Sequence, residues 1–134
     1  MKSYKLISLS LAVIFAVVGL LFLLAPSGVL GFFNIVSKYL GMAPSTEQGS
    51  NFYLILAVGY MYLVTLLAYF MYRNPEDSKF PLLLANGKLA SSILSIFMFI
   101  LHKPYLIYIT NGVVDGFIGL LVIFIYLKMK RAAQ

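Results

Sequence analysis

Four long apolar runs, almost free of charged side chains, constrain this chain more than any other feature of its sequence. We place them at residues 5–25, 46–72, 80–102 and 105–128. A helix needs about 20 apolar residues to cross the hydrocarbon core of a bilayer. Because the runs are continuous and do not alternate at every second residue, they favour helices over a transmembrane barrel. The sequence therefore predicts an all-α, polytopic integral membrane four-helix bundle, with residues 1–134 forming a single transmembrane domain.

The composition agrees with a membrane protein and excludes several kinds of site. The chain is 62% hydrophobic and only 10% charged, whereas soluble domains carry roughly 25% charged residues. It has no cysteine and one histidine, so we expect no disulfide, no thiolate nucleophile and no metal site. The net charge of +6 is spread in small groups between the apolar runs. Without a continuous basic face, we expect no nucleic-acid partner.

The first run also resembles a secretory signal in outline, because basic residues precede it. Signal sequences have apolar regions of roughly 7–15 residues, whereas this run spans 5–25 and is followed at once by Pro26. We therefore expect a retained transmembrane helix. Ala12, Ala16 and Gly19 form a stripe of small residues on it that would let another helix approach closely. The alternative is that small residues fall there by chance.

Residues 27–41 have a different pattern from the long runs. Small or polar residues recur there at helical spacing, while apolar and aromatic residues fill the other positions. The narrow polar face consists of Ser27, Gly31, Asn34 and Lys38. We expect a short amphipathic helix in the membrane interface, with Phe32 and Phe33 on its apolar side and Gly41 at its end. A loop that packs its apolar side against the bundle is the alternative.

The basic residues predict an orientation. If both termini and the loop at residues 73–79 lie on one side, seven Lys and Arg residues gather there, and only Lys38 and Lys103 lie opposite. Since cytoplasmic loops carry the excess of basic residues, we expect a multi-pass protein of the cell membrane with both termini cytoplasmic. His102 and Lys103, beside the helix-breaking Pro104, are then expected at the outer interface.

Two ionisable residues, Lys88 and Asp115, lie where lipid is expected. In a hairpin that turns near residue 103, their depths match within about one helical turn. An unpaired charge at the centre of a bilayer costs roughly 2.5–3.5 kcal/mol. We therefore expect the two side chains to form an ion pair inside the bundle. The alternative is that the Lys88 side chain extends to the lipid headgroups.

Several polar side chains are expected to surround this pair. They are Tyr60, Asn86, Ser91, Ser92, Ser95, Tyr108 and Asn111. We expect the amides of Asn86 and Asn111 to bond the donors and acceptors that the pair leaves free. The pair itself has two possible roles. It either fixes the register of two helices, or it acts as a switch in the transport of protons or substrate along the polar stripe.

Two functions follow from these observations. The chain offers no nucleophile beside a base and no second acid, so we expect neither an enzyme nor a cofactor. The first function is a structural or accessory subunit, whose partners are membrane lipids and other transmembrane subunits. The second is a small transporter or channel that uses Lys88, Asp115 and the polar stripe. Four helices with two charges enclose little space, so this second function requires a homo-oligomer.

Overall fold

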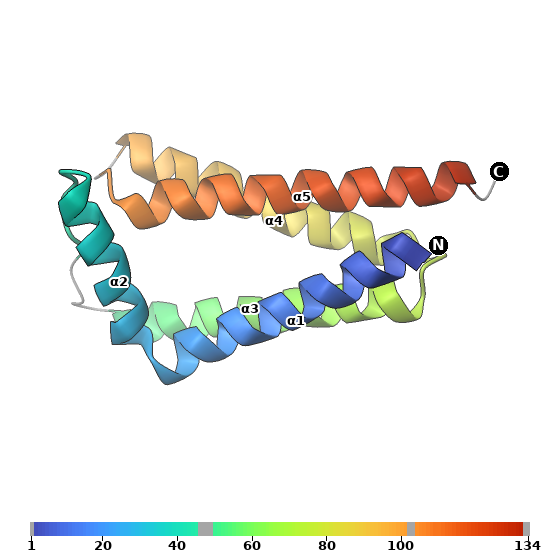
Figure 1. Cartoon of the computed structure of the whole chain (residues 1–134), viewed down its shortest axis with the longest axis horizontal. Coiled ribbons are helices and arrows are strands. Elements are labelled where there is room, and N and C mark those ends of the chain that lie inside the picture. The colour runs from blue at the N-terminus through green and yellow to red at the C-terminus, as the bar shows by residue number, and fades with distance from the viewer. Residues whose placement is uncertain (1, 46–49, 102–103, 133–134) are drawn as a thin grey trace.

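A computed structural model of the chain describes residues 2–45, 50–101 and 104–132, and these residues form helices joined by short connections (Figure 1). The helices are α1 (Lys2–Leu24), α2 (Pro26–Tyr39), α3 (Ser50–Arg73), α4 (Lys79–Leu101) and α5 (Leu106–Ala132). Four of them, α1, α3, α4 and α5, are long and apolar enough to cross a membrane. No strand occurs in the described part of the chain. The predicted all-α bundle of four membrane-spanning helices is confirmed.

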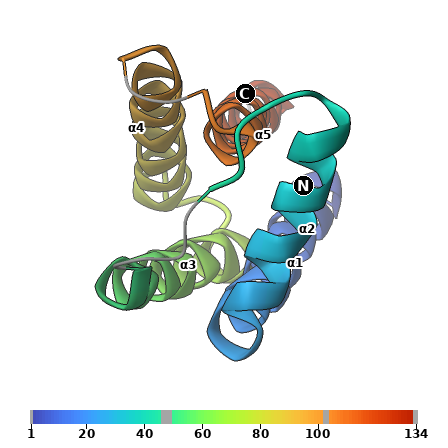
Figure 2. The same cartoon turned by 90° about the vertical axis from the view of Figure 1, so that its left-hand side faces the viewer.

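The four long helices are arranged as two side-by-side pairs (Figures 1 and 2). Helix α1 packs along α3, helix α4 packs along α5, and a smaller contact between α3 and α4 joins the pairs. The beginning of α1, the end of α5 and the connection from α3 to α4 lie at one end of the bundle (Figure 1). Helix α2 crosses the opposite end. All of the predicted spans are therefore present in the expected alternating directions.

Helix α2 is the short amphipathic helix, and its two ends are formed differently. It begins at Pro26, one residue before the predicted Ser27, because proline has no N–H and suits the first helical position. At the other end, Gly41 adopts a φ of 67°, and the Met42 amide donates to the Ser37 carbonyl at 2.9 Å. These features make a Schellman motif, in which a left-handed glycine ends the helix. The predicted end at Gly41 is confirmed.

Some side chains of α2 are exposed, and one bonds the segment that follows the helix. Phe32 is 63% exposed and packs edge-to-face on the half-buried Phe33, with ring centroids 5.7 Å apart. Lys38 is exposed in the last turn, where its charge complements the helix dipole. Asn34 turns inward, donating to the Ser45 carbonyl at 3.1 Å and accepting from its amide at 2.8 Å. This pair of bonds ties the helix to the segment leading to α3.

Nearby residues explain where α5 ends and where α4 begins. Helix α5 continues to Ala132, beyond the predicted end at Lys128, because the basic residues that follow are favourable at the negative end of the dipole. Helix α4 begins at Lys79, whose amide donates to the Asp77 carboxylate at 2.9 Å. Pro81 lies in its first turn, where backbone N–H groups need no intrahelical partner.

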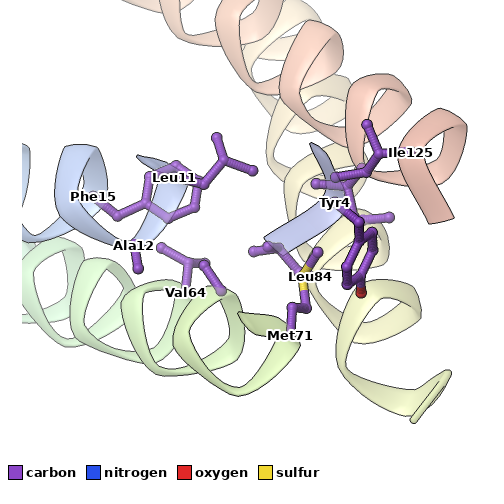
Figure 3. Close-up of a cluster of buried hydrophobic side chains, with 11 residues drawn as sticks. Tyr4, Leu11, Ala12, Phe15, Val64, Met71, Leu84 and Ile125 are labelled. Carbon is purple, nitrogen blue, oxygen red and sulfur yellow. The ribbon is translucent and has the colours of Figure 1, made fainter. Parts of the chain in front are cut away.

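Buried apolar side chains gather mainly in the half of the bundle nearest the termini (Figure 3). All four long helices contribute. The cluster consists of Tyr4, Leu11, Ala12, Phe15, Val64, Ala68, Met71, Leu84, Ala85, Val122 and Ile125. Many large apolar residues elsewhere face outward, as suits a surface in contact with lipid. Because lipid is as apolar as these side chains, close packing has to hold the helices together.

Glycines allow that close packing between α4 and α5. A Cβ atom added at Gly112 would lie 2.8 Å from Ile96. At Gly119 it would lie 2.8 Å from the Leu89 Cγ atom and 3.3 Å from the Ala85 carbonyl oxygen. Both distances to the side chains are shorter than a real Cβ contact allows. The backbones of α4 and α5 can therefore approach each other closely at Gly112 and Gly119, because glycine has no side chain.

The small-residue stripe predicted on the first span packs against another helix of the same chain. Ala12 and Gly19 are buried, and Ala16 is half-buried. A Cβ atom at Gly19 would lie 3.1 Å from the Met61 Cβ atom of α3. The helix that this stripe admits is therefore α3 of the same chain.

We predict that Gly119→Ala destabilises the bundle by about 1–3 kcal/mol, because the added methyl group overpacks the α4–α5 contact. The free energy of unfolding in mixed micelles measures this loss. Gly59→Ala is the matched control, since a Cβ atom there meets nothing within 4 Å and alanine has the higher helix propensity. Equal stability of the two variants would contradict the close approach at Gly119.

Candidate functional site

Lys88 and Asp115 form an ion pair in the interior of the bundle. The Lys88 Nζ atom lies 2.8 Å from the Asp115 Oδ1 atom, and the two side chains are 3% and 6% exposed. Lys88 is on α4 and Asp115 on α5, which lie antiparallel in the register expected from the hairpin. The expected contact is present, and the Lys88 side chain does not extend to the headgroups.

Two aromatic rings from the other two long helices face the same ammonium group. The Lys88 Nζ atom lies 4.7 Å from the centroid of the Phe15 ring on α1 and 5.1 Å from that of the Tyr60 ring on α3. A cation over the face of an aromatic ring is attracted by the ring quadrupole, by about 2 kcal/mol or more when water is excluded. Each long helix thus contributes one residue. We call Phe15, Tyr60, Lys88 and Asp115 the four-helix clamp.

The clamp offsets part of the solvation that the ammonium group loses on burial. An isolated buried charge costs several kcal/mol even after relaxation. Here the carboxylate supplies an opposite charge and a hydrogen-bond acceptor for Lys88, and the rings of Phe15 and Tyr60 supply further electron density. None of these three groups belongs to α4, the helix that carries Lys88. Moving any helix away from the centre therefore exposes the charge to an apolar environment.

Further hydrogen bonds join α4 and α5 on the side of the clamp nearer to α2. The Ser92 hydroxyl donates to the Gly112 carbonyl at 2.6 Å. The Asn111 amide donates to the Ser95 hydroxyl at 2.7 Å and to the Ser91 hydroxyl at 3.2 Å. Interhelical bonds of this kind contribute roughly 0.6 kcal/mol each in membrane proteins. They fix the same register as the ion pair does.

Two amides expected at the ion pair are not there. Asn111 bonds the serines of α4 instead of Lys88 or Asp115. Asn86 is exposed on the outer side of α4, because two residues rotate an α-helix by roughly 200° and so place it away from Lys88. The expectation that both amides complete the pair is wrong.

Tyr60 and Tyr108 line a hollow next to the clamp. Its volume is about 490 Å³, and its polar lining comes from these two tyrosines with Ser91 and Ser95. The Tyr60 hydroxyl is buried and has no hydrogen-bond partner among the described residues. Tyr108 is half-buried, with its ring 5.7 Å from that of Tyr105. The hollow has mostly apolar walls with a few hydroxyl groups.

The sequence did not point to Phe15, although its ring closes one side of the clamp. One phenylalanine in an apolar run carries no signal that separates it from a lipid-facing residue. The expected interfacial residues His102 and Lys103 lie outside the described part of the chain. Within that part, no group of His, Cys, Asp and Glu residues has the arrangement of a metal site.

No protein-family model matches the sequence, and comparisons with curated proteins and with solved structures gave no match.

We predict that the two halves of the ion pair are strongly coupled. Lys88→Met or Asp115→Leu alone strands one buried charge and lowers the free energy of unfolding by about 3–5 kcal/mol. The double variant replaces the pair with neutral side chains of similar size and recovers most of that loss. A double-mutant cycle from unfolding in mixed micelles gives the coupling energy.

Asp77→Asn is the control, because Asp77 is half-buried outside the spans and its contact to the Lys79 amide uses an oxygen that asparagine keeps. We expect it to change the free energy of unfolding by less than about 0.5 kcal/mol. Additive losses at Lys88 and Asp115 would contradict the pairing.

Proposed function

We propose that this chain is a non-enzymatic structural or accessory subunit of the cell membrane, with both termini in the cytoplasm. The observation that carries this proposal is the enclosure of Lys88. Its ammonium group lies against Asp115, Phe15 and Tyr60, which come from three different helices. A charge held in this way stabilises one arrangement of the bundle. A transported ion or proton would instead need a route to water on both sides.

The other polar groups of the spans support the same function. Ser92 and Asn111 are engaged in bonds between α4 and α5, and Thr65 bonds the carbonyl of Met61 in its own helix at 2.7 Å. Ser92 and Asn111 therefore hold α4 against α5, and the Thr65 hydroxyl is satisfied within α3. Outside them, large exposed apolar side chains cover the long helices, and such faces pack against lipid or against other transmembrane chains.

One observation favours a second function, a small oligomeric transporter or channel. The hollow of about 490 Å³ beside the clamp carries the hydroxyl-bearing residues Tyr60, Ser91, Ser95 and Tyr108. In an oligomer, the hollows of several copies would lie together, and these hydroxyl-bearing residues would supply the polar positions of a shared pathway. The ion pair would then lie on the pathway, because intramembrane charges mark substrate and ion pathways in pumps and transporters.

The variant Lys88→Met/Asp115→Leu separates these two functions. For a subunit, we expect the folded double variant to capture the same membrane proteins as the natural chain when complexes are purified in native lipid. Mass spectrometry of the purified complexes measures this. A folded double variant that keeps its partners contradicts the transporter. The subunit is contradicted if the double variant loses ion or solute flux in proteoliposomes and neither it nor the natural chain copurifies with another membrane protein.

We predict the orientation from the distribution of basic residues. Single cysteines at Ser3 and Ser45 lie at opposite ends of the bundle, and the chain has no native cysteine to interfere. In intact cells, an impermeant maleimide should label the Ser45→Cys protein and leave Ser3→Cys unlabelled until the membrane is opened. Labelling of Ser3→Cys from outside would contradict the proposed orientation.

A further inference from the structure

Asn86 is an amide without a partner on the lipid-facing side of α4. It is exposed, and no hydrogen bond joins its side chain to another described residue. It lies in the third turn of a helix of 23 residues, roughly 10 Å from the helix start, which is within the hydrocarbon core of a bilayer. The contrast is Asn111, which is also exposed but bonds Ser91 and Ser95. An amide left unbonded in hydrocarbon costs several kcal/mol.

Asn86 lies in a row of exposed residues with a regular spacing. The row advances by four and then three residues along the whole of α4, and every member is exposed. It consists of Lys79, Leu83, Asn86, Ala90, Ile93, Phe97 and Ile100. Alternating steps of four and three are the spacing of the contact positions in a left-handed coiled coil. We call these residues the α4 seam.

We propose that the α4 seam binds a second copy of this chain, with the two Asn86 amides hydrogen-bonded to each other across a two-fold axis. Helix α4 lies at a corner of the bundle (Figure 2), so its outer side is open to a neighbour. The inference rests on the proposed function in one respect, because it treats an exposed helix face as a packing surface.

The position and chemistry of Asn86 select a second copy as the occupant. Identical chains insert in the same orientation, so their α4 helices run parallel and place both Asn86 residues at the same depth. An amide has donors and an acceptor, and it therefore complements itself across a two-fold axis. Ala90, one turn further along, is small enough to let the two backbones approach. A lipid acyl chain offers neither donor nor acceptor.

Asn86 also gives the contact a single register. One polar residue at a contact position of a coiled coil fixes the alignment of the helices, because any shift leaves the amides unbonded. The apolar members Leu83, Ile93 and Phe97 pack equally well in several alignments. The amide therefore determines which alignment forms.

Cross-linking in lipid vesicles tests the contact. Ala90→Cys places a thiol on the α4 seam. Leu120→Cys places a thiol on the surface of α5, where the Leu120 residue is 63% exposed. The chain contains no other thiol. Upon oxidation we expect Ala90→Cys to form disulfide-linked dimers rapidly. Leu120→Cys should form them only at the rate of random collision, which falls as lipid is added.

Replacement of the amide tests its role. Förster transfer between labelled copies, measured as vesicles are diluted with lipid, gives the dissociation constant of the dimer. We expect Asn86→Leu to raise this constant about 3- to 15-fold, the range measured for interhelical hydrogen bonds in membranes. Asn86→Gln keeps an amide, on a side chain one methylene longer, and should remain close to the natural chain.

The outcomes separate this inference from the proposed function. A chain that stays monomeric in lipid but copurifies with another membrane protein overturns the α4 seam and leaves the subunit role standing. A dimer that forms with no other chain, and that Asn86→Leu weakens, supports the seam and counts against an accessory role. A dimer unaffected by Asn86→Leu, or linked as readily through Leu120→Cys, overturns the seam.

Discussion

The buried ammonium group of Lys88 is the constraint on which the arrangement of the four long helices depends. A charge in this environment is tolerated only where the protein supplies what water no longer does. Asp115 supplies an opposite charge at 2.8 Å, and Phe15 and Tyr60 supply aromatic faces. Apolar contacts alone would allow the helices to slide or rotate at little cost, since lipid competes equally well for apolar surface. The charge makes one alignment preferable.

The clamp and the glycines act on different degrees of freedom. Gly112 and Gly119 determine how closely α4 and α5 approach, whereas the ion pair determines their alignment along the axis. Apolar packing is concentrated toward the termini. Toward α2, the bonds from Ser92 and Asn111 hold α4 against α5. The pair of α1 and α3 meets the pair of α4 and α5 mainly through the apolar cluster and the four-helix clamp.

The sequence predicted the features that depend on one-dimensional patterns. Long runs almost free of charged residues predicted the spans, and the turn near residue 103 placed Lys88 within about one helical turn of Asp115. The sequence could not predict which face of a uniformly apolar helix points inward, because no polar stripe marks it. Phe15 was missed for this reason. Asn86 was assigned to the ion pair by proximity in sequence, although the rotation of the helix turns it outward.

The contact between Lys88 and Asp115 can be measured directly in a bilayer. The sequence has two aspartates, so Asp77→Asn leaves Asp115 as the single one. Solid-state NMR on this variant, with ¹⁵N-lysine and ¹³C-aspartate, measures the distance between a lysine Nζ atom and the Asp115 carboxylate. We predict that one lysine Nζ atom lies at ion-pair distance from this carboxylate and that the contact disappears in Lys88→Met. A carboxylate without any lysine contact, or a contact that persists in Lys88→Met, would contradict this prediction.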